Sequence, residues 1–199
     1  MLQLARGILA LALGLIITLT LEHTPAFGLV TFGIFALLSG AALLLAVVRS
    51  AYPGRMRVAF FGQAVVTVAA GIVALTVPGG DVVFFAILVG SWAVVTGLLE
   101  ASSGFLARSF APLARDWIIA GVLTVLLGGV ALLLPPDFVQ AFEGDKGNAG
   151  ILTSSVILIG VVGAWAILVG VLQCISAVTV RADRSESAAG SVATGTAST

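Results

Sequence analysis

The chain has 199 residues, of which 60% are hydrophobic and 9% are charged, and its formal net charge at pH 7 is zero. Soluble domains carry about a quarter charged residues, so this composition excludes a soluble globular protein and indicates an integral membrane protein. The nine Lys and Arg residues are too few and too dispersed to form a nucleic-acid-binding surface.

Six apolar runs are long enough to cross a hydrocarbon core of about 30 Å, which requires ~20 helical residues. They cover residues 4–21, 26–48, 58–77, 82–107, 115–134 and 151–180. The runs are apolar on every side, unlike the alternating strands of outer-membrane barrels, and backbone groups in lipid are satisfied within helices. The sequence therefore predicts an all-α integral membrane domain of six transmembrane helices over residues 1–180.

The first run has an alternative interpretation as a cleaved secretory signal. Arg6 precedes its apolar stretch, and Thr24-Pro25-Ala26 offers small residues for cleavage. Gly7 and Gly14, however, stand in register with small residues of the third and fifth runs. We therefore expect the first run to remain as a structural helix.

Small residues seven positions apart recur on the runs, and the pattern repeats every 57 residues. Two series carry it: Gly14, Gly71 and Gly128 in one, and Gly33, Gly90 and Gly163 in the other. The last step of the second series is 73, which is the repeat plus a 16-residue insertion. The repeat predicts three tandem helical hairpins, over about 4–48, 58–107 and 115–180. They are parallel repeats, because each contains two spans.

Seven residues are two helical turns, so the small residues of a run share one face of its helix. Helices in lipid associate through close van der Waals contact, which small residues permit, and this spacing favours a shallow crossing near +20°. We therefore predict helix-packing roles for nine glycines: Gly14, Gly33, Gly40, Gly71, Gly90, Gly97, Gly128, Gly163 and Gly170.

Charged residues are segregated between the two sides of this topology. Eight of the nine basic residues fall on one side: Arg6, Arg49, Arg55, Arg57, Arg108, Arg115, Arg181 and Arg184. The other side holds Lys146 and five acidic residues: Glu22, Asp81, Asp137, Glu143 and Asp145. By the positive-inside rule, both termini are predicted to be cytoplasmic.

The insertion lies in the third external loop, where two alternatives remain open. Pro136-Asp137 could start a short interfacial helix with Phe138 and Phe142 on one face. The loop could equally be irregular and polar, ending in residues 144–148. The tail, residues 181–199, is rich in Ala, Ser, Thr and Gly without an apolar period, which predicts a disordered cytoplasmic segment.

Two runs of the repeat, residues 89–100 and 162–173, resemble the repeated G-x-W-a-x-x-x-G-i-x-e segment of the HdeD-like family. Arg115-Asp116-Trp117 and the helix-ending Pro78 and Pro135 are similar to the family as well. The first hairpin departs, with Phe35 in place of Trp. The resemblance implies a multi-pass protein of the bacterial cytoplasmic membrane, associated with acid-stress resistance, and it supplies no catalytic residues to carry over.

Glu100 lies inside the fourth run, and an intramembrane carboxylate is a candidate functional residue. Its repeat equivalents are Leu43 and Gln173, and Arg6 and Gln63 fall at a similar depth. We predict an intramembrane polar site made of Glu100, Gln173, Gln63 and Arg6. It could clamp helices together, which the sequence favours, or form a protonatable site in a proton or substrate path. Glu100 could also simply reach the interface.

His23 is the only histidine, and it falls on the external side. Histidine changes its charge over the range of mild acidification, so His23 is a candidate pH sensor, with a solvated loop residue as the alternative. With one His and one Cys, the chain offers little from which a metal cluster or a Ser-His-Asp site could be assembled, and no cofactor motif occurs. We therefore expect no enzyme, no metal and no cofactor.

The leading hypothesis is a non-enzymatic membrane protein that supports envelope or acid-stress tolerance through packing or partner contacts. The alternative is a small transporter or channel that conducts protons or a solute past Glu100. The expected partners are the lipid bilayer and either further copies of this chain or other membrane proteins, without nucleic acid.

Overall fold

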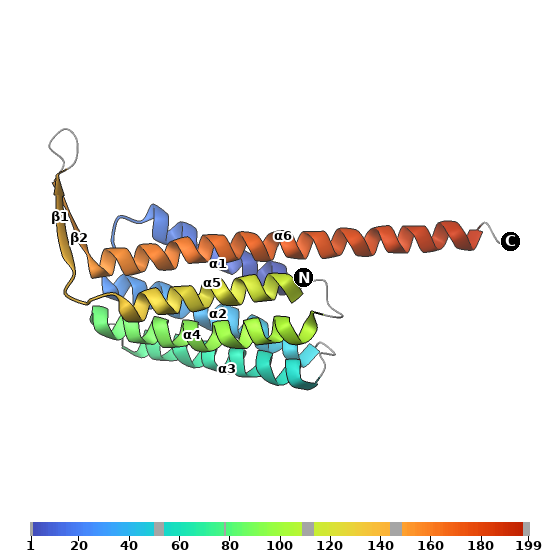
Figure 1. Ribbon diagram of the computed structural model, residues 1–199, viewed down its shortest axis with the longest axis horizontal. Helices are drawn as coiled ribbons and strands as arrows, with labels where there is room; N and C mark the ends of the chain where they lie inside the picture. Colours follow the sequence, from blue (N-terminus) through green and yellow to red (C-terminus); the bar gives the residue numbers. More distant parts are fainter. Residues whose placement is uncertain (1, 50–53, 78, 109–113, 144–148, 197–199) are drawn as a thin grey trace.

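The structure is a computed structural model that describes residues 2–49, 54–77, 79–108, 114–143 and 149–196. Its elements are α1 (Leu2–Leu19), α2 (Pro25–Arg49), α3 (Gly54–Thr76), α4 (Val82–Ala107), α5 (Ala114–Leu133), β1 (Val139–Glu143), β2 (Ala149–Thr153) and α6 (Ser154–Thr196). The helices form an antiparallel bundle, with the start of α1 and the end of α6 toward one end and the β hairpin at the other (Figure 1).

Among the described residues, five helices are long and apolar enough to cross a membrane: α2, α3, α4, α5 and the part of α6 at Ser154–Arg181. The apolar stretch of α1, Leu4–Leu19, is shorter. Large apolar side chains such as Leu98 and Leu168 are more than half exposed on the outside of the bundle, at 57% and 58%. Such a surface fits contact with lipid. The chain is therefore a multi-pass membrane protein with an all-α bundle, and the crossing of the membrane by α1 stays a prediction.

The helix starts follow local capping rules. The Asp81 side chain accepts a hydrogen bond from the Phe84 backbone N–H at 2.8 Å, and the Thr24 hydroxyl accepts one from Phe27 at 3.3 Å. Pro25 occupies the first helical position of α2, where its missing N–H costs nothing. These caps fix where α2 and α4 enter the bundle.

The helices pack most closely in three pairs, α1 with α6, α2 with α3, and α4 with α5, which we call the seams. A Cβ on Gly14, Gly71 or Gly128 would lie 2.9, 3.0 or 2.8 Å from a glycine carbonyl oxygen across the seam. All nine predicted packing glycines lie at seams: Gly14, Gly163 and Gly170 between α1 and α6, Gly33, Gly40 and Gly71 between α2 and α3, and Gly90, Gly97 and Gly128 between α4 and α5.

The seams join helices of different predicted hairpins. The two helices within a hairpin pack less closely, and apolar grooves of about 140 Å³ and 180 Å³ lie between α1 and α2 and between α5 and α6. The seven-residue stripes therefore bring neighbouring hairpins together, because glycine allows two backbones to approach where a side chain would hold them apart.

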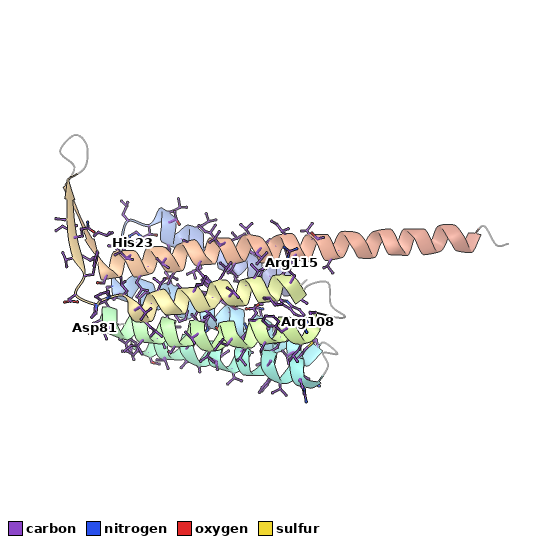
Figure 2. The ribbon with its side chains drawn as sticks, viewed as in Figure 1. His23, Asp81, Arg108 and Arg115 are labelled. Carbon is purple, nitrogen blue, oxygen red and sulfur yellow. The ribbon has the colours of Figure 1, made fainter. Side chains whose placement is uncertain are left out.

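The charged ends of the bundle follow the segregation in the sequence. His23 and Asp81 lie at the end that carries the β hairpin, whereas Arg108 and Arg115 lie at the opposite end (Figure 2). Lys146 and Asp145 fall outside the described residues, and no side chain is described for Arg184. The separation gives the bundle one acidic and one basic end.

The insertion forms neither of the two alternatives expected for it. Residues Val139–Glu143 and Ala149–Thr153 pair as antiparallel strands, with Val139 opposite Thr153 and Glu143 opposite Ala149. β-Branched residues favour strands. At the base of the hairpin, the Ser154 hydroxyl donates to the carbonyl of Pro135, which follows α5, at 2.7 Å. The predicted irregular end, residues 144–148, lies outside the described residues.

The tail also differs from its prediction. Residues 181–196 continue α6 as a helix to Thr196, whereas their composition predicted disorder. An alanine-containing segment that extends an existing helix needs no new nucleus, and nucleation is the costly step of helix formation. Residues 197–199 lie outside the described residues.

Candidate functional site

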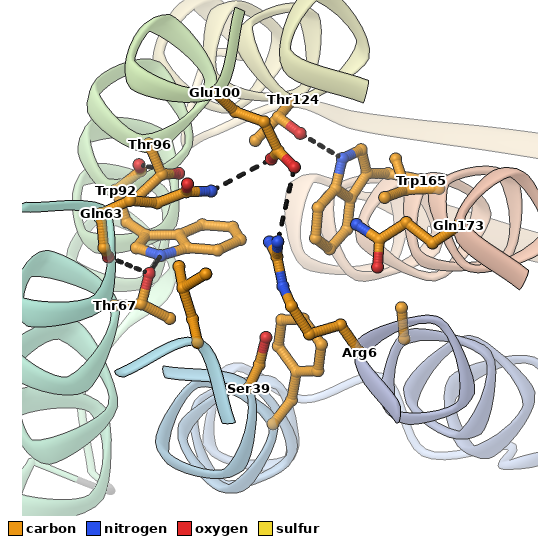
Figure 3. Close-up of a pocket in the computed structure, with 14 residues that line it drawn as sticks. Arg6, Ser39, Gln63, Thr67, Trp92, Thr96, Glu100, Thr124, Trp165 and Gln173 are labelled. Atoms are coloured by element: carbon orange, nitrogen blue, oxygen red, sulfur yellow. Dashed lines mark hydrogen bonds and ion pairs between the residues drawn. The ribbon is translucent and has the colours of Figure 1, made fainter. Parts of the chain in front are cut away.

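A cavity of about 30 Å³ lies inside the bundle, on the axis that the six helices surround (Figure 3). Its lining residues fall into five sets whose members stand 57 residues apart, or 73 across the insertion: Arg6 and Gln63; Ala10, Thr67 and Thr124; Phe35, Trp92 and Trp165; Ser39, Thr96 and Val169; Leu43, Glu100 and Gln173. Equivalent positions of the repeat therefore converge on one site.

The four predicted polar residues are brought together in this cavity, and we call them the polar layer. Glu100 Oε2 accepts a hydrogen bond from Gln63 Nε2 at 3.0 Å, and Glu100 Oε1 lies 3.6 Å from Arg6 Nη1 in an ion pair. Gln173 lines the same cavity from α6. The carboxylate thus joins α4 to α1 and α3, and burial strengthens these contacts because little water screens them.

The polar layer is only partly satisfied. All four residues are more than nine-tenths buried, with exposures of 8% for Arg6, 3% for Gln63 and Glu100, and 5% for Gln173. Four of their atoms have no hydrogen-bond partner among the described residues: Arg6 Nε, Gln63 Oε1, Glu100 Oε1 and Gln173 Oε1. Buried polar atoms left unpaired are costly, so this side of the cavity has unused hydrogen-bonding capacity.

Three aromatic rings close the axis on the other side of the cavity, and we call them the aromatic triangle. The ring centroids of Phe35, Trp92 and Trp165 lie 5.5 to 6.4 Å apart, and each pair meets edge to face. This arrangement is favourable for aromatic rings. It leaves apolar surface across the centre of the bundle.

The two tryptophans of the triangle are hydrogen-bonded to threonines of neighbouring helices. Trp92 Nε1 donates to Thr67 Oγ1 at 3.2 Å, and Trp165 Nε1 donates to Thr124 Oγ1 at 3.1 Å. At the equivalent place in the first repeat, Phe35 has no N–H to donate and Ala10 has no hydroxyl to accept it. The donor and the acceptor are present together or absent together.

Beyond the triangle, toward the β hairpin, the core is apolar. Its largest buried side chains include Leu29, Phe85 and Leu158, each at most 1% exposed. The hydroxyls of Thr18 and Thr31 in this half bond to carbonyls of their own helices, as such side chains commonly do. The polar capacity of the axis is therefore concentrated on the side of Glu100.

The structure does not bring His23 to this site. The residue lies at the β-hairpin end of the bundle, and its Nδ1 is 3.3 Å from the Leu21 carbonyl oxygen (Figure 2). His23 therefore does not line the cavity that holds Glu100. Among the described residues, no group of three or more His, Cys, Asp or Glu side chains could hold a metal ion.

Sequence analysis found the polar layer but missed its neighbours. Ser39, Thr96 and the two threonines that bind the tryptophans also line the cavity. The sequence contained a usable signal, because the Thr-Trp pairs and the Ala-Phe pair stand at matching repeat positions. A comparison of the three repeats, position by position, would have revealed that Ala and Phe replace Thr and Trp together in the first repeat.

Comparisons with known proteins support a repeat domain in this chain. No curated protein and no solved structure matches the chain. A family described as a short repeat of unknown function, DUF308, matches residues 62–134 and again residues 151–199, which together make more than half of the chain. The chain therefore belongs to the DUF308 family, whose repeat domain is the one found in HdeD-like membrane proteins.

Proposed function

We propose that this chain is a non-enzymatic membrane protein of the HdeD-like type that supports envelope or acid-stress tolerance, and that Glu100 serves it as an interhelical clamp. The observation that carries the proposal is the double engagement of Glu100. Its carboxylate pairs with Arg6 on α1 and accepts from Gln63 on α3. A group held by two partners stabilises one arrangement of the helices.

The closed axis supports the clamp over a conducting role. A proton or solute path requires polar groups or water along the whole membrane. Here the aromatic triangle lies across the axis, and the core beyond it is built from large apolar side chains such as Phe85. A static bundle that resists disruption under stress needs no such path.

The proposal includes a topology and a set of partners. Three parallel hairpins surround the axis, with the basic end and both termini in the cytoplasm of a bacterium, and with His23 outside. The bilayer is the first partner. Further copies of this chain, or other membrane proteins, would contact the lipid-facing helices and transmit the stabilising effect to the envelope.

Two substitutions of Glu100 test the clamp. Glu100→Gln keeps the shape and much of the hydrogen bonding, so thermal stability in detergent and survival of acid challenge should largely persist. Glu100→Leu removes every polar contact, and both properties should fall. A Glu100→Gln protein that folds normally but gives no acid protection would contradict the clamp.

Conduction through Glu100 is the second candidate function. The observation in its favour is the set of unpaired polar atoms that line the cavity, because a mobile proton or solute would find partners there. Proton flux into proteoliposomes tests it directly. Flux that depends on Glu100 and disappears in Glu100→Gln would establish conduction, whereas flux equal to that of empty liposomes would reject it.

A further inference from the structure

The direct contacts within the polar layer gather around Glu100, although Gln63 Oε1 beside it has no hydrogen-bond partner among the described residues. On one side, Glu100 is engaged by Gln63 and Arg6. On the other side, Gln173 on α6 and Ser39 on α2 flank the Arg6 side chain (Figure 3). The described residues provide no hydrogen-bond partner for Arg6 Nε or Gln173 Oε1.

The chemistry of these atoms defines what could fill the gap. Arg6 Nε is a donor, Gln173 Oε1 is an acceptor, and the Ser39 hydroxyl can serve as either. A charged ligand is disfavoured, because Arg6 and Glu100 already balance each other. A neutral molecule that both donates and accepts would satisfy all three groups.

The volume of the cavity limits the size of the molecule that can bind there. A cavity of about 30 Å³ has room for one or two water molecules. Internal waters are found where polar groups would otherwise stay unpaired, and they commonly make about three hydrogen bonds. We propose that an ordered water molecule occupies this cavity, accepting from Arg6 Nε and donating to Gln173 Oε1, with Ser39 as its third partner.

Such a water would extend the clamp around the axis. Glu100 joins α4 to α1 and α3, and the water would join α1 to α2 and α6. This inference rests on the proposed clamp, because the ion pair with Glu100 holds the Arg6 side chain at the cavity. Arg6 would then connect both sides, and five helices would share one hydrogen-bonded layer.

An experimental structure of the full chain in lipid, at a resolution that reveals ordered water, tests the proposal. We expect density for one water within hydrogen-bond distance of Arg6 Nε and Gln173 Oε1, and its loss in Gln173→Leu. A dry cavity, a direct Arg6–Gln173 hydrogen bond, or density for a lipid chain or a larger ligand would overturn it.

Thermal unfolding supplies a second measurement. Gln173→Leu and Ser39→Ala should each lower the melting temperature, because each removes a partner of the water. Gln140→Leu is the matched control, since Gln140 is exposed on β1. If neither cavity variant melts below this control, the water site is wrong. The failure of the clamp itself would appear separately, as lost acid survival in a stable Glu100→Gln protein with the water density intact.

Discussion

The aromatic triangle and the polar layer lie about two helical turns apart on α4, yet they use their polar atoms in different ways. In the triangle, both indole N–H groups donate to threonines, and the position without a donor also lacks the acceptor. In the polar layer, four buried atoms have no hydrogen-bond partner among the described residues. A layer whose polar atoms are all paired closes the bundle, whereas a layer with unpaired polar atoms can bind a further molecule.

The two layers also differ in how similar the residues at their three equivalent repeat positions are. The triangle keeps an aromatic residue at each of its three positions, because its task is to fill space. In the polar layer, the equivalent positions hold Leu43, Glu100 and Gln173, so only one of the three carries a charge. This single buried carboxylate needs one counter-charge, which Arg6 supplies.

The largest effect should come from breaking the ion pair in the polar layer. Arg6→Leu leaves Glu100 buried without its counter-charge, and such a change costs about 3–5 kcal/mol of folding free energy. The double variant Arg6→Leu with Glu100→Leu should recover much of the loss. Equilibrium unfolding in mixed micelles measures both. A double variant that is less stable than Arg6→Leu would contradict the pairing.

A change at a seam should disturb both layers together, because the seams fix the helices that carry them. Gly128→Leu would force a side chain against the Gly90 carbonyl, which lies 2.8 Å from its Cβ position, and should cost about 1–3 kcal/mol. Gly129→Leu is the matched control, since nothing lies within 4 Å of a Cβ at Gly129. Thermal unfolding should separate the two variants, and equal melting temperatures would contradict the seam.

In the aromatic triangle, Thr124→Val keeps the shape but leaves Trp165 Nε1 buried without an acceptor, at a cost of about 1–3 kcal/mol. Thr18→Val is the control, because its hydroxyl bonds only to the Gly14 carbonyl of its own helix. Tryptophan fluorescence during unfolding reports the difference. The interpretation of the triangle as a fully paired layer fails if both variants unfold alike.

The smallest effect should come from rebuilding the missing pair in the first repeat. Phe35→Trp alone adds a buried N–H without a partner, and Ala10→Thr alone adds a hydroxyl that can bond only to its own helix. Together they should recover about 1 kcal/mol relative to the sum of the single changes. Strictly additive unfolding energies in this double-mutant cycle would show that the two positions do not communicate.

Much of the bundle followed from periodicity. The apolar runs predicted the spans, and α2 to α5 begin and end within a few residues of the predicted bounds. Glycine spacing predicted which face of each helix is close-packed, because two helical turns return to the same face. It did not predict the partner helix, since a face can meet any neighbour that presents a complementary groove.

The sequence predicted which four residues form the polar layer, but not which of their atoms contact one another. Depth along a helix follows from residue number, so Arg6 and Glu100 could be assigned to one layer. Which oxygen of Glu100 meets Arg6 and which meets Gln63 depends on side-chain direction, which spacing leaves open. The β hairpin was missed because cross-strand pairing, such as Val139 with Thr153, is a tertiary choice that a short segment does not encode alone.

By itself, the sequence determined that this protein lies in a membrane, that its helices repeat, and where their small and polar residues fall. These properties depend on composition and on helical geometry, which are local. Only the tertiary structure decided that α1 closes against α6 across the length of the chain, and that Arg6 meets a carboxylate 94 residues away. Contacts of that range arise when whole helices find the packing that buries their small faces and pairs their charges.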